Sequence, residues 1–140
     1  MRSIKIVLIL TGVLFAGPAM AQDVVLPTVT LSTTNIVPPP VSNAMATASF
    51  TLNPSSRQLT WQLTVNGLTT PPIAVDLERL SDAGLQPVLN LPFNATQEPM
   101  RGSATLSPTQ AAELMAGQFA IVLRTTAYPR GELRGLIKPQ

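Results

Sequence analysis

Two pairs of charged residues in this sequence have the spacing that would place their side chains on one face of a β-strand. Asp76 and Glu78 lie two residues apart within a stretch that alternates apolar and polar residues. Glu132 and Arg134 lie two residues apart near the C-terminus. Side chains at positions i and i+2 of a strand leave the same face about 6–7 Å apart. Each pair is therefore a candidate site for binding a charged group.

The acids Asp76 and Glu78 are open to three interpretations. Two neighbouring carboxylates could hold a hard cation such as calcium or magnesium. They could instead pair with arginines in a structural ion-pair network, in which a solvated pair contributes about 0–1 kcal/mol. They could also form a charged patch that faces a protein or another ligand.

Catalytic chemistry finds little support in the composition. The chain has no histidine and no cysteine, which excludes Ser-His-Asp and Cys-His catalysis and metal sites built on imidazole or thiolate. Glu78 and Glu132 could in principle hydrolyse a glycoside if they lay about 5–10 Å apart, but the sequence has no aromatic cluster for a sugar cleft. We predict a protein that is not an enzyme and uses no cofactor. We also expect no zinc or copper site tighter than about micromolar, because oxygen ligands suit hard cations.

The N-terminus has the pattern of a secretory signal peptide. Arg2 and Lys5 precede an apolar run from Ile6 to Ala16, and Ala19-Met20-Ala21 is a small-x-small cleavage site. A transmembrane helix needs roughly 20 apolar residues, more than this run has. We therefore predict that residues 1–21 are a cleaved signal peptide. The protein is then exported to a periplasm or to the extracellular space, without stable membrane insertion after cleavage.

Export also changes the charge of the protein. The full chain has 9 basic and 7 acidic side chains. Because Arg2 and Lys5 leave with the signal peptide, the remainder carries equal numbers of each and is formally neutral. No basic footprint for nucleic acid remains. An exported domain without cysteine also has no disulfide, so its core alone must stabilise it.

The mature sequence divides into an arm and a β-rich domain. Residues 22–43 are rich in threonine and proline and include Pro38-Pro39-Pro40, which favours an extended conformation without ladder hydrogen bonds. We predict a loose arm there and a folded domain over residues 44–140. Alternation of apolar and polar residues predicts antiparallel strands in this domain. These are residues 44–53, 59–65, 73–80, 87–91 and 100–106.

One short helix and a C-terminal hairpin complete the prediction. Ser107 is a candidate N-cap, followed by Pro108 at the first helical position and Gln110 for a capping box, and Gly117 is a candidate C′ residue. A strand-like run over residues 118–126 then reaches a turn at residues 129–131 and a return limb with Glu132 and Arg134. The predicted fold class is all-β: an antiparallel β-sandwich or barrel-like domain with one short helix.

Several of these segments occur in an order that resembles the CHRD domain, the module repeated in chordin and found singly in many exported microbial proteins. The resemblance covers about residues 44–137. Its most specific element is the ending Ala127-Tyr128-Pro129-Arg130-Gly131-Glu132-Leu133-Arg134-Gly135, which we call the C-terminal motif. The other matching segments are ASFTL at 48–52, LTW at 59–61, AVDLE at 74–78 and LSPTQ at 106–110.

The sequence departs from the family pattern at three positions. The family typically has a His-aliphatic-His pair in the middle strand and a further histidine before the last hairpin. By position, Asp76 and Glu78 replace the pair and Arg124 replaces the third histidine. The resemblance therefore implies that Arg124 lies near the two acids, and nitrogen-based metal binding cannot be transferred to this chain.

The binding residues we predict are Asp76, Glu78, Arg124, Glu132 and Arg134. The resemblance implies an exported, non-enzymatic module that binds another protein or has a structural role. The alternative is a periplasmic domain that binds a small molecule or a hard cation through the Asp/Glu/Arg cluster.

Overall fold

The structure is a computed structural model that describes residue 12 and residues 22–139. The predicted signal peptide, apart from Gly12, lies outside the described residues. Among the described residues, no helix has the length and apolar character needed to cross a membrane.

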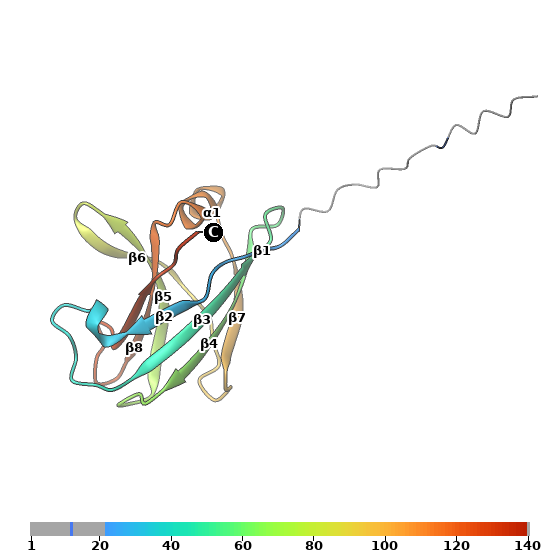
Figure 1. The fold of residues 1–140 in the computed structure, drawn as a ribbon. Helices are drawn as coiled ribbons and strands as arrows, with labels where there is room; N and C mark the ends of the chain where they lie inside the picture. The colour runs from blue at the N-terminus through green and yellow to red at the C-terminus, as the bar shows by residue number, and fades with distance from the viewer. Residues whose placement is uncertain (1–11, 13–21, 140) are drawn as a thin grey trace, which may run out of the picture.

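Nine strands in the described part of the chain form one antiparallel sheet, whose strand order is β6-β5-β8-β9-β2-β3-β4-β7, with β1 paired to β3. Their bounds are β1 (Val24–Val25), β2 (Val29–Ser32), β3 (Met45–Leu52), β4 (Gln58–Asn66), β5 (Pro72–Ser81), β6 (Gly84–Asn90), β7 (Met100–Thr105), β8 (Phe119–Thr125) and β9 (Leu133–Leu136). The all-β prediction is confirmed. The barrel-like form is the one observed, because a single sheet curls strongly rather than two sheets stacking (Figure 1).

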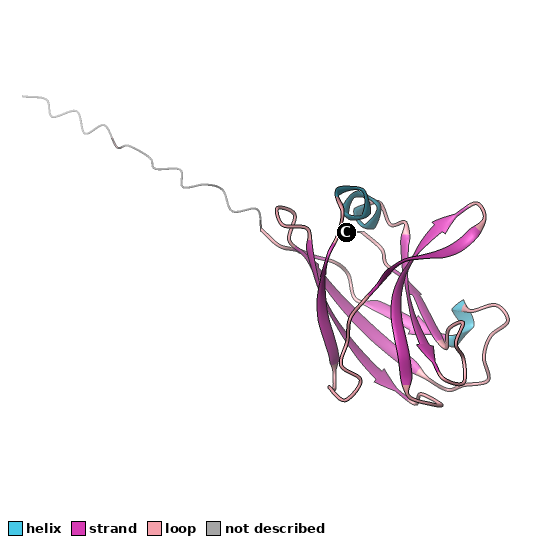
Figure 2. Ribbon diagram, turned by 180° about the vertical axis from the view of Figure 1, so that it is seen from behind, coloured by secondary structure: helices cyan, strands magenta, loops and turns pink. Residues whose placement is uncertain are grey.

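The sheet curls around the buried core residues, and a helix lies over one end of the sheet (Figure 2). In β3 and β4, alternate residues such as Phe50, Trp61 and Leu63 are almost fully buried, whereas the threonines between them face solvent. β5 and β8 contribute Leu77 and Phe119 from the opposite wall. The period-2 pattern of the sequence thus corresponds to one apolar and one solvated face.

The helix α1 (Pro108–Met115) begins as predicted. The Ser107 hydroxyl accepts a hydrogen bond from the Gln110 backbone N–H, and the Gln110 side chain accepts one from the Ser107 N–H, which completes a capping box. Gly117 has a positive φ of 74° just after the helix, as a C′ glycine requires. Leu114 is fully buried and anchors α1 on the core.

The prediction of a loose arm over residues 22–43 is wrong for part of that segment. β2 lies inside the sheet between β3 and β9, where Val29 and Leu31 are buried and Thr30 is exposed. The prolines did not prevent this strand, because they flank it at Pro27 and at residues 38–40 instead of interrupting it. The folded domain therefore begins before residue 44. A 3₁₀ turn, η1 (Thr33–Asn35), follows β2.

β2 and β9 approach each other so closely that a glycine is needed. The two strands pair at Ser32 and Arg134, and the adjacent Gly135 packs directly on β2. A Cβ added at Gly135 would lie 2.7 Å from the Thr30 carbonyl oxygen and 2.7 Å from Val29 Cγ1. The first of these neighbours is backbone, so the strands would have to separate.

We therefore expect Gly135→Ala to destabilise the fold by about 1–3 kcal/mol, the usual cost of forcing extra volume into a packed site. Urea denaturation of the variant and the wild type would measure this difference. A variant as stable as the wild type would mean that β2 is not held tightly against β9.

Candidate functional site

The predicted charged residues gather on the face of the sheet opposite the core. In β5, Val75 and Leu77 point into the core, so Asp76 and Glu78 project from the other face. β8 lies beside β5, with Ala74 opposite Arg124. β9 follows on the far side of β8, with Arg134 opposite Val122, and Val122 in turn is opposite Asp76. The pleat therefore brings four of the five predicted residues onto one surface.

Arg124 bridges the two acids. Its Nε donates to Asp76 Oδ2 at 2.7 Å, and its Nη2 donates to Glu78 Oε1 at 3.2 Å. Its Nη1 donates to the Pro129 carbonyl oxygen at 3.1 Å. Asp76 Oδ1 accepts a further bond, from Asn90 Nδ2 at 2.8 Å. Arg124 therefore lies beside both acids, as the family resemblance implied.

Arg134 approaches Glu78 from the other side. Its Nε donates to Glu78 Oε2 at 3.2 Å, and its Nη1 donates to the Asn35 carbonyl oxygen at 3.2 Å. The Asn35 amide in return donates to the Arg134 carbonyl oxygen at 2.9 Å. Glu78 therefore interacts with two arginines at once.

These four side chains, Asp76, Glu78, Arg124 and Arg134, form a cluster with two negative and two positive charges. The Glu78 side chain is the most buried, at 4% exposed, and the others range from 13% to 19%. Each carboxylate oxygen already accepts at least one hydrogen bond, and guanidinium groups occupy the space beside both acids. The arrangement favours an internally paired network over a site with open coordination for a cation. Among the described residues, no three acidic side chains converge as metal ligands.

Glu132 does not join this cluster. We expected it to share a face with Arg134, but β9 begins only at Leu133, so strand alternation does not extend to Glu132. The Glu132 N–H donates to the Leu123 carbonyl oxygen, although Leu123 is already the register partner of Leu133. This irregularity turns the Glu132 side chain towards the loops at one end of the sheet, where it is fully buried.

The Glu132 carboxylate holds two distant loops together. Its Oε1 accepts a hydrogen bond from Ser42 Oγ at 2.6 Å and another from the Thr69 backbone N–H at 3.1 Å. Ser42 Oγ also accepts a bond from the Ala44 N–H. Burial by itself raises the pKa of Glu132, but the hydrogen bonds, chiefly from Ser42 and the Thr69 N–H, outweigh it and hold the pKa below the ordinary value of 4.5. Glu132 is therefore a buried anchor that holds both loops through Oε1, while its Oε2 has no hydrogen-bond partner among the described residues.

Sequence reasoning did not identify the residues that complete these networks. Asn35 and Ser42 lie in the segment that we predicted to be a loose arm, and Asn90 is at the end of β6. Asn35 and Arg134 are separated by 99 positions in sequence. No local pattern marks such partners, since the fold alone brings them together.

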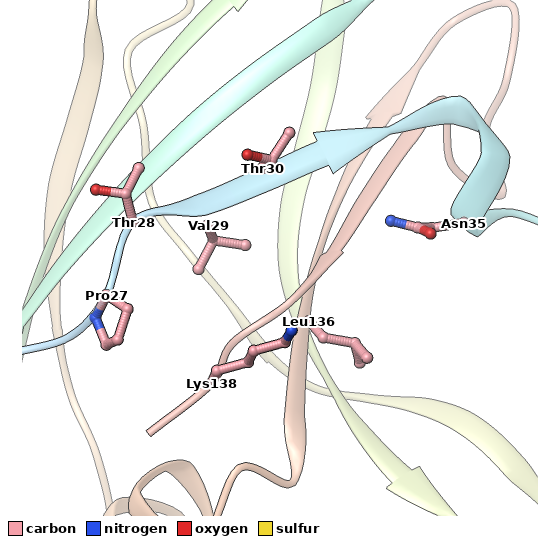
Figure 3. A pocket seen from close by; sticks show the side chains of 7 residues that line it. All are labelled: Pro27, Thr28, Val29, Thr30, Asn35, Leu136 and Lys138. Carbon is pink, nitrogen blue, oxygen red and sulfur yellow. The ribbon is translucent and has the colours of Figure 1, made fainter. Parts of the chain in front are cut away.

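A separate shallow pocket of about 370 Å³ lies on the seam between β2 and β9 (Figure 3). None of the five predicted site residues lines it. Its charged lining residue is Lys138, and the Asn35 amide at its edge is engaged by the Arg134 carbonyl. The residues that line it are Pro27, Thr28, Val29, Thr30, Asn35, Leu136 and Lys138.

A family model for the CHRD domain matches residues 28–137. The match covers most of the chain, so the chain belongs to the CHRD domain family. It starts immediately before β2, in agreement with the place of β2 inside the sheet. Comparisons with curated proteins and with solved structures give no significant match.

Proposed function

We propose that this CHRD-domain chain is exported, and that it acts without catalysis as a module that binds another protein or supports an assembly in the periplasm or outside the cell. The observation that supports this proposal is the pairing within the charged cluster. Asp76, Glu78, Arg124 and Arg134 satisfy one another and leave no acid–base pair facing a cleft. Catalysis would require a reactive group with access to substrate.

The alternative function, in which the charged cluster binds a small molecule or a hard cation, has less support. A cation would have to displace arginines that already contact both acids, at Nε–Oδ2 and Nε–Oε2 distances of 2.7 Å and 3.2 Å. Calcium prefers six to eight oxygen ligands, and two carboxylates with one nearby amide supply too few.

The test of protein binding is co-purification from the exported fraction of the producing organism. The chain recovered after export would carry an affinity tag, and the captured proteins would be quantified by mass spectrometry. We expect one partner near equimolar amounts that survives moderate salt. A control purification would use an unrelated exported protein that carries the same tag, and a partner captured equally by both baits would count as nonspecific. The absence of any partner enriched on the native bait would contradict the proposal.

The predicted export has its own test. We expect the secreted protein to begin at Gln22, because Ala19-Met20-Ala21 precedes it as a cleavage site. Intact-mass measurement of secreted material distinguishes residues 22–140 from residues 1–140. A mass that includes the first 21 residues would show that the segment is retained as an anchor.

A further inference from the structure

The described surface has an apolar groove next to the charged cluster, with a volume of about 430 Å³. One wall is the loop that follows η1, and the other is the turn between β8 and β9. Both walls consist mainly of proline, valine and other apolar groups. The lining residues are Ile36, Val37, Pro38, Pro39, Pro40, Val41, Ala127, Tyr128, Pro129, Arg130 and Gly131.

Both ends of the proline loop, residues 36–41, are fixed by residues of the C-terminal motif. Before the loop, Asn35 exchanges two hydrogen bonds with Arg134. After the loop, Ser42 donates to Glu132. Within the loop, the Val41 carbonyl oxygen accepts a bond from the Tyr128 hydroxyl at 3.0 Å.

The proline loop is therefore preorganised. Its three consecutive prolines have little freedom in φ, and the bonds at its ends restrict the rest. Ile36 is buried against the domain. Its Cδ1 would lie 3.3 Å from a Cβ added at Gly131, so the loop packs closely on the turn between β8 and β9. A loop that is already ordered loses little conformational entropy when it binds, which favours recognition by a partner.

Two valines of the loop are fully presented to solvent. Val37 is 91% exposed and Val41 is 90% exposed, the highest values among the exposed large apolar residues of the described chain. Scattered exposed apolar residues are ordinary, but here two lie on the rim of one apolar groove, which is typical of an interaction site. A small molecule inside the groove would leave both valines in water, whereas a protein surface would cover them.

Arg130 supplies a charge at this site. It is the only charged residue that lines the groove, it is exposed, and its side chain makes no hydrogen bond or ion pair within the described residues. By contrast, Arg124 and Arg134 are fully engaged by acids nearby. A guanidinium binds a carboxylate with two parallel hydrogen bonds and so favours an acidic partner.

We propose that this groove docks an extended segment of a partner protein, with apolar side chains lying along the proline loop and a carboxylate paired with Arg130. This inference rests on the proposed protein-binding function and adds the place and the chemistry of the contact. The C-terminal motif then has a defined role: Tyr128, Glu132 and Arg134 hold the loop, and Arg130 faces the partner.

The experiment selects ligands from a displayed library of random peptides on the chain as recovered after export. The enriched peptides are synthesised, and their affinities are measured by fluorescence anisotropy. We expect enriched sequences to combine an apolar run with Asp or Glu. Arg130→Glu and Val41→Asp should each weaken binding about tenfold or more, because they reverse the charge and place a charge on the apolar rim.

The matched control is Arg101→Glu, which makes the same change at an exposed arginine of β7 that does not line the groove. It should leave affinity within roughly twofold. Circular dichroism would establish that all three variants are folded. Because the changed side chains are exposed, the expected loss of binding would not come from unfolding.

Three results would overturn the inference. The first is that the enriched peptides bind Arg130→Glu and Val41→Asp as tightly as the wild type. The proposed protein-binding function would then stand, but the groove would not be the binding site. Another is a selection with no enriched sequence. The third is a concentration-dependent dimer in sedimentation that Val41→Asp dissociates, which would assign the groove to a second copy of this chain.

Discussion

Replacing Glu78 with leucine is expected to lower the free energy of unfolding by about 3–5 kcal/mol, the usual cost of removing one partner from a buried ion pair. Glu78 accepts hydrogen bonds from both Arg124 and Arg134. Without it, Arg134 keeps only the Asn35 carbonyl oxygen as an acceptor. Two guanidinium groups would then lie close together with Asp76 as their remaining acid, in a region where water cannot solvate them fully.

The comparison that isolates this effect is a fourfold variant in which Asp76, Glu78, Arg124 and Arg134 are all changed to leucine. We expect it to be more stable than Glu78→Leu, since replacing an entire buried ionic cluster with apolar side chains is often neutral or stabilising. Replacing only the two acids and Arg124 would be a poorer control, because Arg134 would be left without its acid.

Urea denaturation of the wild type and the two variants provides the measurement. Arg124→Leu should fall between the wild type and Glu78→Leu, because Asp76 keeps its bond from Asn90 and Glu78 keeps Arg134. If Glu78→Leu is as stable as the fourfold variant or more so, the four charges act independently and the cluster does not exist as an energetic unit.

Local sequence patterns predicted the elements whose interactions are local. In β3 and β4, the alternation of apolar and polar residues in the sequence matches the alternation of buried and exposed side chains. The capping box at Ser107 depends on residues only three positions apart. The pairing of Asp76 and Glu78 with Arg124 was also anticipated. That prediction needed the family resemblance, because Arg124 is separated from Asp76 by 48 positions and from Glu78 by 46 positions in the sequence.

Features that depend on distant segments were missed. β2 is only four residues long and lies between prolines, so its alternation is too short to identify a strand. Its place in the sheet depends on β3 and on β9, which is the last strand of the described chain. The position of Glu132 depends on an irregularity where β9 begins. Gly131 directly precedes Glu132 with a positive φ of 131°, and a glycine in a strand pattern can mark a bulge, but it does not indicate which way the Glu132 side chain turns.

Several of the missed features depend on contacts between the segment that follows β2 and the C-terminal motif. The segment between β2 and β3 is not a free arm, because charged residues of the C-terminal motif bind it at Asn35 and Ser42. Arg134 does so while it also neutralises Glu78. The motif therefore couples the charged cluster to the proline loop, and a change that loosens the cluster should also loosen the loop.

Replacing Glu132 with alanine is expected to lower the free energy of unfolding by about 2–4 kcal/mol, because Ser42 Oγ and the Thr69 N–H would lose their shared acceptor and a buried cavity would form. Glu132→Gln keeps the volume and an acceptor oxygen, so we expect a smaller loss of about 1–2 kcal/mol from the weaker, uncharged hydrogen bonds. The exposed Glu98→Gln is the matched control and should change stability by no more than about 0.5 kcal/mol.

The pH dependence separates the charge of Glu132 from its packing. The pKa of Glu132 in the folded protein lies below the ordinary value of 4.5, so in this range the unfolded chain binds the proton more readily than the folded one. The stabilisation is therefore fully present above about pH 5 and is lost as the pH falls through 4.5 towards the folded pKa. Urea denaturation from neutral pH to about pH 3 should show the wild-type and Glu132→Gln stabilities converging as the solution is acidified. Two curves that remain parallel would show that Glu132 is not held as a carboxylate, and that the loops at Ser42 and Thr69 are fixed by packing instead of by its charge.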